Sequence, residues 1–207
     1  MAAALPLALD IATLERVILR PGPEFSDDDF FEFCQEHELL RIERNSDGEL
    51  IIMAPIGLEG GFTEFDVAWQ LSAWARKDNR GVVLSSNAGF TLPDRSVFSP
   101  DASWVPNERW KTVSRKLRQR FAPIVPAFVI EVRSPSDRKK DLQNKMLVYM
   151  RNKVELGWLI DPLSKTVTIY RPGEEPVELL NPDSVSGEGP VAGFVLDLKH
   201  IYDQLAS

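Results

Sequence analysis

The sequence contains few of the residues that build the commonest metal and disulfide sites. Its 207 residues include one cysteine and two histidines. The single thiol, Cys34, cannot form an internal disulfide, and so few thiol and imidazole groups cannot build a zinc finger. We therefore expect a protein of the reducing cytoplasm that has no structural zinc site.

Long apolar runs are also missing. Residues 1–12 are apolar for a short stretch, but no basic residue precedes them and Asp10 interrupts them. A signal peptide begins with basic residues, and a membrane helix needs about 20 consecutive apolar residues. We therefore expect neither a signal peptide nor a membrane span, and no membrane partner.

The overall composition is that of a folded domain with an acidic surface. Hydrophobic residues make up 43% of the chain and charged residues 27%, with 24 Lys and Arg against 31 Asp and Glu, a net charge of −7. This length suits one domain, since a single core grows efficiently up to about 250 residues. An acidic total argues against a nucleic-acid partner, because phosphate binding depends on positive surface charge.

The charge is unevenly distributed along the chain. Residues 107–153 contain 13 Lys and Arg against 4 Asp and Glu, a net charge of +9. Residues 1–64 and 154–207 carry −10 and −6, and the charges in residues 65–106 cancel. Such a basic block is either a solvated helix face with its loop or a surface that binds phosphate.

Hydrophobic periodicity predicts a mixture of helices and strands, and hence an α/β fold. An N-cap at Ser26 followed by three aspartates begins a short helix, and turn residues at 45–48 join two strands into a hairpin. The strand at 127–132 is a nearly continuous apolar run, which is typical of a central strand buried on both faces. The expected helices cover 26–37, 59–78, 107–120, 138–152 and 198–205, and the expected strands cover 40–44, 50–53, 81–85, 88–92, 99–105, 127–132, 157–161, 167–170 and 177–180.

Two carboxylates lie on strands that otherwise look buried. Asp101 follows Ser99-Pro100, and Glu131 interrupts the apolar run at 127–132. Burying an ionised carboxylate is costly unless a cation or several hydrogen bonds compensate it. Mg²⁺ is one such cation, because it prefers carboxylate and carbonyl oxygens. On spacing alone, each acid is equally compatible with an arginine partner or with capping a turn.

Hydrolysis of a phosphodiester also benefits from a protein cation near the metal. Residue 133 lies on the same strand face as Glu131, but it is Arg133, which cannot give up a proton. Lys145, on the following predicted helix, is the lysine whose amine can lie over the same carboxylates. The alternative for Lys145 is an ordinary surface lysine on a helix flank.

Four ordered sequence blocks carry a family resemblance. They read GELIIMAP at 48–55, GFTLPDRSVFSPDASWV at 89–105, FVIEVRSPSDRKKDLQNKMLVYM at 128–150 and LGWLIDPLSKTVTIYRPG at 156–173. With these blocks, the chain resembles the Uma-two family of bacterial restriction-endonuclease-like proteins, which belongs to the PD-(D/E)XK nuclease superfamily. The resemblance covers most of the chain from about residue 39 onward.

The resemblance implies a restriction-endonuclease-like core, with a mixed central sheet flanked by helices. An N-terminal helix and hairpin and peripheral C-terminal strands complete the expected α/β fold. We assign residues 1–38 to an N-terminal helical extension and 39–207 to the restriction-endonuclease-like domain, in a single domain overall.

The resemblance also implies a set of site residues. Asp101 matches the first acid of the motif and Glu131 the second, while Arg133 stands where the motif lysine is usual. In this family the lysine role falls to Lys145 on the next helix. Glu59 is the candidate for an acid from the first core helix, with Glu64 and Asp66 nearby.

The implied function is a metal-dependent endonuclease that hydrolyses DNA phosphodiester bonds. Asp101 and Glu131 would bind Mg²⁺, with Mn²⁺ as a substitute and the Val132 carbonyl as a third ligand, and Lys145 would position the attacking water. A homodimer is expected, since cutting both strands of a duplex is simplest with two related sites. The basic residues expected to contact DNA are Arg115, Lys116, Arg133, Arg138, Lys139 and Lys140.

Two alternatives remain at the level of the sequence. Arg133 in the lysine slot and the acidic surroundings are compatible with a catalytically silent nuclease-fold module that binds DNA or a protein partner. A nuclease specific for RNA, or for branched or single-stranded DNA, is equally compatible. The sequence does not favour a serine hydrolase, because His37 and His200 lie in remote terminal elements with no evident triad partner.

Overall fold

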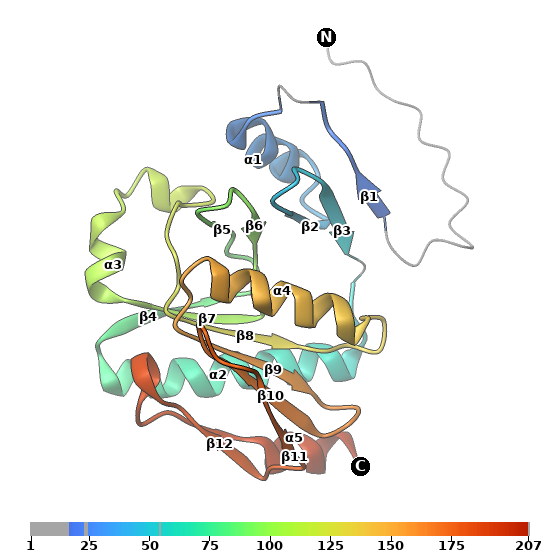
Figure 1. Cartoon of the computed structure of the whole chain (residues 1–207), viewed down its shortest axis with the longest axis vertical. Helices are drawn as coiled ribbons and strands as arrows, with labels where there is room; N and C mark the ends of the chain where they lie inside the picture. The colour runs from blue at the N-terminus through green and yellow to red at the C-terminus, as the bar shows by residue number, and fades with distance from the viewer. Residues whose placement is uncertain (1–16, 23–24, 54, 207) are drawn as a thin grey trace.

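The computed structural model describes residues 17–22, 25–53 and 55–206 (Figure 1). Residues 1–12, on which the expectation about a signal peptide rests, lie outside this part of the chain. Within the described residues, no helix combines the length and the apolar character that crossing a membrane requires.

The centre of the molecule is a mixed six-stranded sheet. Its strand order is β11-β10-β9-β8-β7-β4, in which β8 and β9 are parallel and all other neighbours are antiparallel. Every residue of β8 is buried, so the prediction of a central strand covered on both faces is confirmed. The strands are β4 (Gly81–Ser85), β7 (Ala102–Pro106), β8 (Phe128–Val132), β9 (Leu156–Asp161), β10 (Thr166–Tyr170) and β11 (Val177–Leu180).

Helices cover both faces of this sheet. The helix α2 (Leu58–Asp78) packs below it in Figure 1 beside α5 (Leu198–Leu205), and α4 (Lys139–Arg151) packs above it. Along β8, Phe128 and Ile130 join the apolar core on the α2 side, whereas Val129 joins the core on the α4 side. Because strand side chains alternate, Glu131 faces α4 as Val129 does.

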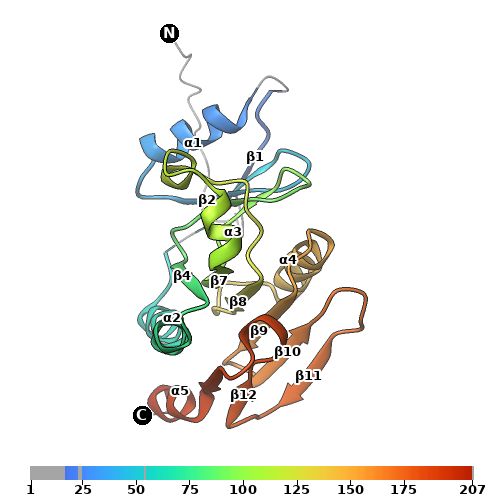
Figure 2. The same ribbon diagram turned by 90° about the vertical axis from the view of Figure 1, so that its left-hand side faces the viewer.

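A second sheet lies at one end of the molecule. Its strand order is β1-β3-β2-β6-β5, and α1 (Asp27–Glu36) packs its Phe30 against this sheet. The predicted N-cap at Ser26 is confirmed, and so is the predicted hairpin, which pairs β2 with β3. Figure 2 shows this sheet and α1 at the opposite end from α5. The strands are β1 (Val17–Leu19), β2 (Arg41–Arg44), β3 (Leu50–Met53), β5 (Phe90–Thr91) and β6 (Val97–Phe98).

The basic segment after β7 forms less helix than its sequence predicts. The expected helix at 107–120 is wrong in its length, since α3 (Asn107–Thr112) ends early and only a short 3-10 turn, Leu117–Gln119, follows. Val113 adopts an extended conformation and is buried in the core on the α4 side of the sheet. Burial of this apolar side chain therefore ends the helix despite the favourable basic sequence around it.

The C-terminal part closes the molecule. A two-stranded ribbon of β12 (Ser184–Ser186) and β13 (Val195–Asp197) leads into α5, whose first turn is capped by the Asp197 side chain. Phe194 beside the ribbon stacks on Trp158 of β9, at a distance of 5.7 Å between ring centroids. The ribbon and α5 thus complete the core beneath the central sheet, and the expected closing helix at 198–205 is confirmed. The expected C-terminal strands at 167–170 and 177–180 are β10 and β11, with β11 at the edge of the central sheet, whereas the ribbon was not among the expected strands.

A close approach between β4 and β7 gives a first prediction. A Cβ atom added at Gly81 would lie 2.5 Å from the Val105 carbonyl oxygen, whereas one at Gly61 in α2 would meet no atom within 4 Å. We expect Gly81→Ala to lower the free energy of unfolding by about 1–3 kcal/mol. Gly61→Ala should raise it by about 0.5–1 kcal/mol, because alanine favours the helix. Urea unfolding followed by circular dichroism measures both changes, and equal values for the two variants would contradict the packing.

Candidate active site

Antiparallel pairing brings the two predicted acids to the same edge of the central sheet. The pair Ala102↔Ile130 places the start of β7 beside the end of β8. Asp101 immediately precedes β7 and Glu131 lies near the end of β8, and they are only 5% and 2% exposed. The acids therefore meet although 30 positions separate them in the chain.

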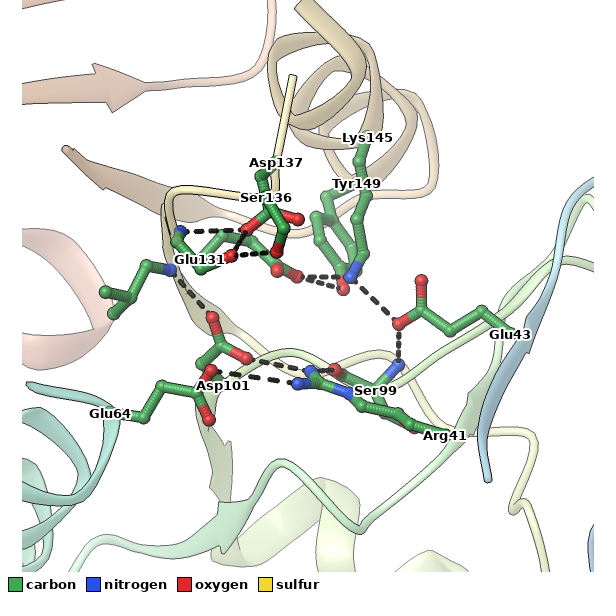
Figure 3. Close-up of polar contacts among 12 residues, drawn as sticks. Arg41, Glu43, Glu64, Ser99, Asp101, Glu131, Ser136, Asp137, Lys145 and Tyr149 are labelled. Atoms are coloured by element: carbon green, nitrogen blue, oxygen red, sulfur yellow. Dashed lines mark hydrogen bonds and ion pairs between the residues drawn. The ribbon is translucent and has the colours of Figure 1, made fainter. Parts of the chain in front are cut away.

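The Asp101 carboxylate is held at both oxygens. Its Oδ2 accepts a hydrogen bond of 2.7 Å from the Val132 backbone N–H, and its Oδ1 accepts one of 2.8 Å from Arg41 Nη2. The same Nη2 donates to the Ser99 carbonyl at 2.8 Å, and Arg41 Nη1 lies 3.8 Å from Glu64 Oε1. Arg41 thus bridges Asp101 and Glu64, as Figure 3 shows.

The Glu131 carboxylate faces α4. Its Oε1 lies 2.8 Å from Lys145 Nζ and accepts a hydrogen bond of 2.8 Å from the Tyr149 hydroxyl. Lys145 and Tyr149 are four residues apart, so they share one face of the helix. Lys145 Nζ also donates to Glu43 Oε1 at 2.8 Å, and the Ser99 N–H donates to the same oxygen at 2.8 Å. The Lys145 ammonium therefore lies between two carboxylates, as seen in Figure 3.

The cluster carries more acidic than basic groups. Its two cations, Arg41 and Lys145, lie among four carboxylates: Glu43, Glu64, Asp101 and Glu131. Six ionisable groups in a largely buried place perturb one another strongly, because the local dielectric constant is low.

The pKa values in the cluster follow from this crowding. Burial and the neighbouring Asp101 raise the pKa of Glu64 to about 7. The pKa of Glu131 is also raised, because burial outweighs the favourable charge of Lys145. Burial alone would lower the pKa of Lys145, but Glu131 and Glu43 offset it and raise the pKa above its ordinary value. Lys145 is therefore an ammonium group at neutral pH and acts as a hydrogen-bond donor.

The predicted site residues occupy different positions relative to the cluster. Asp101, Glu131 and Lys145 lie within it, and Val132 contributes its N–H. Asp101 also has the arginine partner that the sequence left open, namely Arg41.

Arg133 and Glu59 have other surroundings than the charged cluster. The Arg133 guanidinium pairs with Asp161 at 3.0 Å. Glu59 is exposed in the first turn of α2 and lines a pocket of about 210 Å³ together with Val132 and Arg133. The α2 acid that reaches Asp101 through Arg41 is Glu64, one turn further along the helix.

The remaining basic candidates lie on two separate surfaces. Arg138 and Lys140 are exposed at the start of α4, where Lys139 pairs with Glu178 at 3.0 Å. Arg115 and Lys116 are exposed after α3. Figure 1 shows α3 on the left and the loop that leads into α4 on the right. The basic block of the sequence is therefore not one continuous patch.

Three residues of the cluster did not emerge as candidates from the sequence. Arg41 and Glu43 come from β2 of the small sheet, and Tyr149 comes from α4. A signal for the first two exists, because charged residues at positions i and i+2 of a strand share one face. Their partners lie 23 to 102 positions away, so the sequence alone does not show what this face contacts.

The carboxylates of the cluster are the type of donor that a hard divalent metal takes. Carboxylate oxygens are the ligands that Mg²⁺ prefers, and one or two of them suffice when substrate phosphate completes the shell. In the described residues, no three His, Cys, Asp or Glu side chains are grouped closely enough to form a ready-made metal centre. The cations Arg41 and Lys145 occupy the space between the carboxylates.

Comparison with known proteins identifies the family. The family model Uma2, described as "Putative restriction endonuclease", matches residues 27–199. The chain belongs to the Uma2 family. This membership confirms the resemblance that the four sequence blocks indicate.

A solved structure shows the same fold as this Uma2 chain. It is the crystal structure of a putative nuclease belonging to DUF820 from Anabaena variabilis ATCC 29413, with a TM-score of 0.66 and 20% sequence identity. The match covers 79% of this chain and 90% of that one. It confirms the restriction-endonuclease-like core. No curated protein matches the chain.

The raised pKa of Glu64 gives a second prediction. Between its ordinary value of 4.5 and about 7, the folded protein retains a proton that the unfolded chain has lost. Stability is therefore lost as pH rises through this range. Glutamine does not titrate, so we expect the Glu64→Gln variant not to lose stability in this way. Relative to the wild type, its free energy of unfolding should therefore rise by on the order of 2 kcal/mol between pH 5 and pH 8.

The measurement is chemical denaturation at a series of pH values. Glu59→Gln is the matched control, since Glu59 is an exposed glutamate on the same helix. Parallel pH profiles for the wild type and Glu64→Gln would contradict the assignment.

Proposed function

We propose that this Uma2 protein is a Mg²⁺-dependent endonuclease that hydrolyses DNA in the cytoplasm. The observation that carries the proposal is the contact of Lys145 with the buried Glu131, at the strand ends where Asp101 also lies. Burying several ionisable groups in one place costs stability, and such clusters are typical of catalytic sites. The family and the fold, both described as nuclease-like, agree with this assignment.

Asp101 and Glu131 are the residues proposed to hold the metal. When bound, Mg²⁺ polarises a phosphoryl oxygen and activates a water molecule as the nucleophile. The Val132 carbonyl is the proposed third ligand. The Val132 N–H points toward Asp101, and in an extended strand the carbonyl of the same residue points to the same side.

Lys145 is proposed to orient the attacking water and to stabilise the negative charge of the transition state. Its ammonium is fixed by Glu131 and Glu43, so it needs little reorganisation during the reaction. Because its pKa is raised, Lys145 acts as a hydrogen-bond donor and not as a general base. Tyr149 supports this role by holding Glu131 from the other side.

The proposed substrate contact is the basic surface at the start of α4. Arg138, Lys139 and Lys140 follow directly from the loop after β8, the strand that carries Glu131. Arg133, in the same loop, and the separate pair Arg115 and Lys116 are candidates for further phosphate contacts. We also propose a homodimer, because two related sites match the two strands of a duplex.

A cleavage experiment tests the function directly. The protein is incubated with plasmid and linear DNA and with Mg²⁺ or Mn²⁺. Asp101→Asn, Glu131→Gln and Lys145→Met should each lower the cleavage rate at least about a hundredfold, because each removes an electrostatic contribution to the transition state. Asp47→Asn, an exposed acid in the hairpin turn, is the control and should cleave as the wild type does.

Calorimetry with Mn²⁺ separates the two functions that the sequence left open. An endonuclease should bind the metal in a manner that depends on Asp101 and Glu131. A silent nuclease-fold module should bind DNA or a protein without such metal binding. Absence of cleavage of DNA, together with absence of metal binding, would overturn the proposal.

The salt dependence of DNA binding tests the proposed interface. Replacing Arg138 and Lys140 by Gln should lower the slope of log K against log salt by about 0.9 for each lost phosphate contact. The matched double variant of Arg76 and Lys77, which are exposed in the last turn of α2, removes the same charge outside the proposed contacts. An equal reduction in both double variants would show that net charge, and not the α4 surface, governs binding.

A further inference from the structure

The guanidinium of Arg41 binds Asp101, one of the two acids proposed to hold the metal. It donates to Asp101 Oδ1 and to the Ser99 carbonyl, both at 2.8 Å, and it lies 3.8 Å from Glu64. The other Asp101 oxygen accepts the Val132 N–H. Both oxygens of Asp101 therefore have partners, and a metal must compete with Arg41 for this carboxylate.

Asp101 and Arg41 differ in their exposure to solvent and in how fully their polar atoms are paired. The Asp101 side chain is 4% exposed, whereas the Arg41 side chain is 28% exposed and so reaches solvent. Arg41 Nε is buried, and no hydrogen-bond partner for it exists among the described residues. Asp101 is fixed by the backbone of β8, but Arg41 has donor capacity that its present contacts leave unused.

Arg41 also differs from Lys145 in its chemistry. A guanidinium is planar and donates two parallel hydrogen bonds, a geometry that suits carboxylate and phosphate equally well. From a strand of the small sheet, Arg41 contacts two acids with one nitrogen each, because Nη2 donates to Asp101 and Nη1 lies 3.8 Å from Glu64. A phosphate group near Asp101 would offer the same kind of oxygen pair.

We infer that Arg41 is a substrate-contacting residue that exchanges partners during the reaction. In the metal-free protein it serves as the internal cation of Asp101 and Glu64. With metal on Asp101, its guanidinium leaves that carboxylate and binds a phosphate oxygen of the DNA. This inference rests on the proposed function, since it requires a metal at Asp101.

The inference makes two opposite predictions for one variant. Arg41→Met removes the competing cation, so the dissociation constant for Mn²⁺ in the absence of DNA should fall about tenfold, the ratio that corresponds to one lost charged hydrogen bond. The single-turnover rate of DNA cleavage at saturating Mn²⁺ should instead fall about a hundredfold, because the phosphate contact is lost. A purely structural role would weaken metal binding and cleavage together.

The controls separate folding from chemistry. Arg80→Met removes another arginine that pairs with an acid, in this case Asp78 at the end of α2. It should change neither the dissociation constant for Mn²⁺ nor the rate of DNA cleavage. Thermal unfolding verifies that the variants fold. Arg41→Gln is the second variant, because it keeps a donor for the Ser99 carbonyl without the charge, and it should also tighten Mn²⁺ binding.

The outcomes distinguish this inference from the proposed function. Mn²⁺ binding that depends on Asp101 but is unchanged or weaker in both Arg41 variants overturns the exchange and leaves the function intact. Tighter Mn²⁺ binding with unchanged cleavage overturns the phosphate contact. No Mn²⁺ binding by the wild type, together with no cleavage, overturns the proposed function itself.

Discussion

The buried ammonium of Lys145 is the interaction on which the organisation of the site depends. It joins Glu131 of the central sheet to Glu43 of the small sheet, from a helix that belongs to neither. An unpaired charge in this position would cost several kcal/mol, so the three elements are held together by the need to compensate it. Arg41 repeats the pattern, because it comes from the small sheet and pairs with Asp101 beside the central one. The small sheet is thus part of the site and not an appendage.

The central part of this arrangement follows from the sequence in physical terms. The apolar run of β8 predicts a buried strand, and a lone carboxylate within such a run predicts a compensating partner. The ladder between β7 and β8 then places Asp101 beside Glu131. The helix that follows β8 makes Lys145 available, but its role depends on the family resemblance, because an isolated lysine on a helix normally belongs to the surface.

Other parts could not be predicted, because they depend on distant contacts. Glu43 meets Lys145 across 102 positions, and no local pattern encodes that meeting. The charged alternation of β2 shows only that one strand face is polar. The length of α3 was predicted wrongly for a similar reason. Its basic residues favour a helix, but the end is set by burial of Val113 in a core built from other segments.

The charges of each sequence segment do not all lie on the surface of the folded protein. Part of the −10 carried by residues 1–64 is buried in the site, because Glu43 and Glu64 lie there. The +9 of residues 107–153 is divided between two surfaces and the candidate site, where the Lys145 side chain is only 11% exposed. Net charge by segment therefore overestimates both the acidity and the basicity that a partner would meet.

Because β7 and β8 run in opposite directions, the segment that connects them lies at the other end of the strands from the two site acids. Asp101 lies before the first strand and Glu131 near the end of the second, so the connection between the strands leaves from the far edge of the sheet. That connection contains α3 and the 3-10 turn. Val113, Ala122 and Ile124 of this connection pack in the core, but its exposed residues 114–119 can change through insertion or drift without displacing either acid. The topology thus separates a part of the chain free to acquire new recognition from the part that must conserve the chemistry.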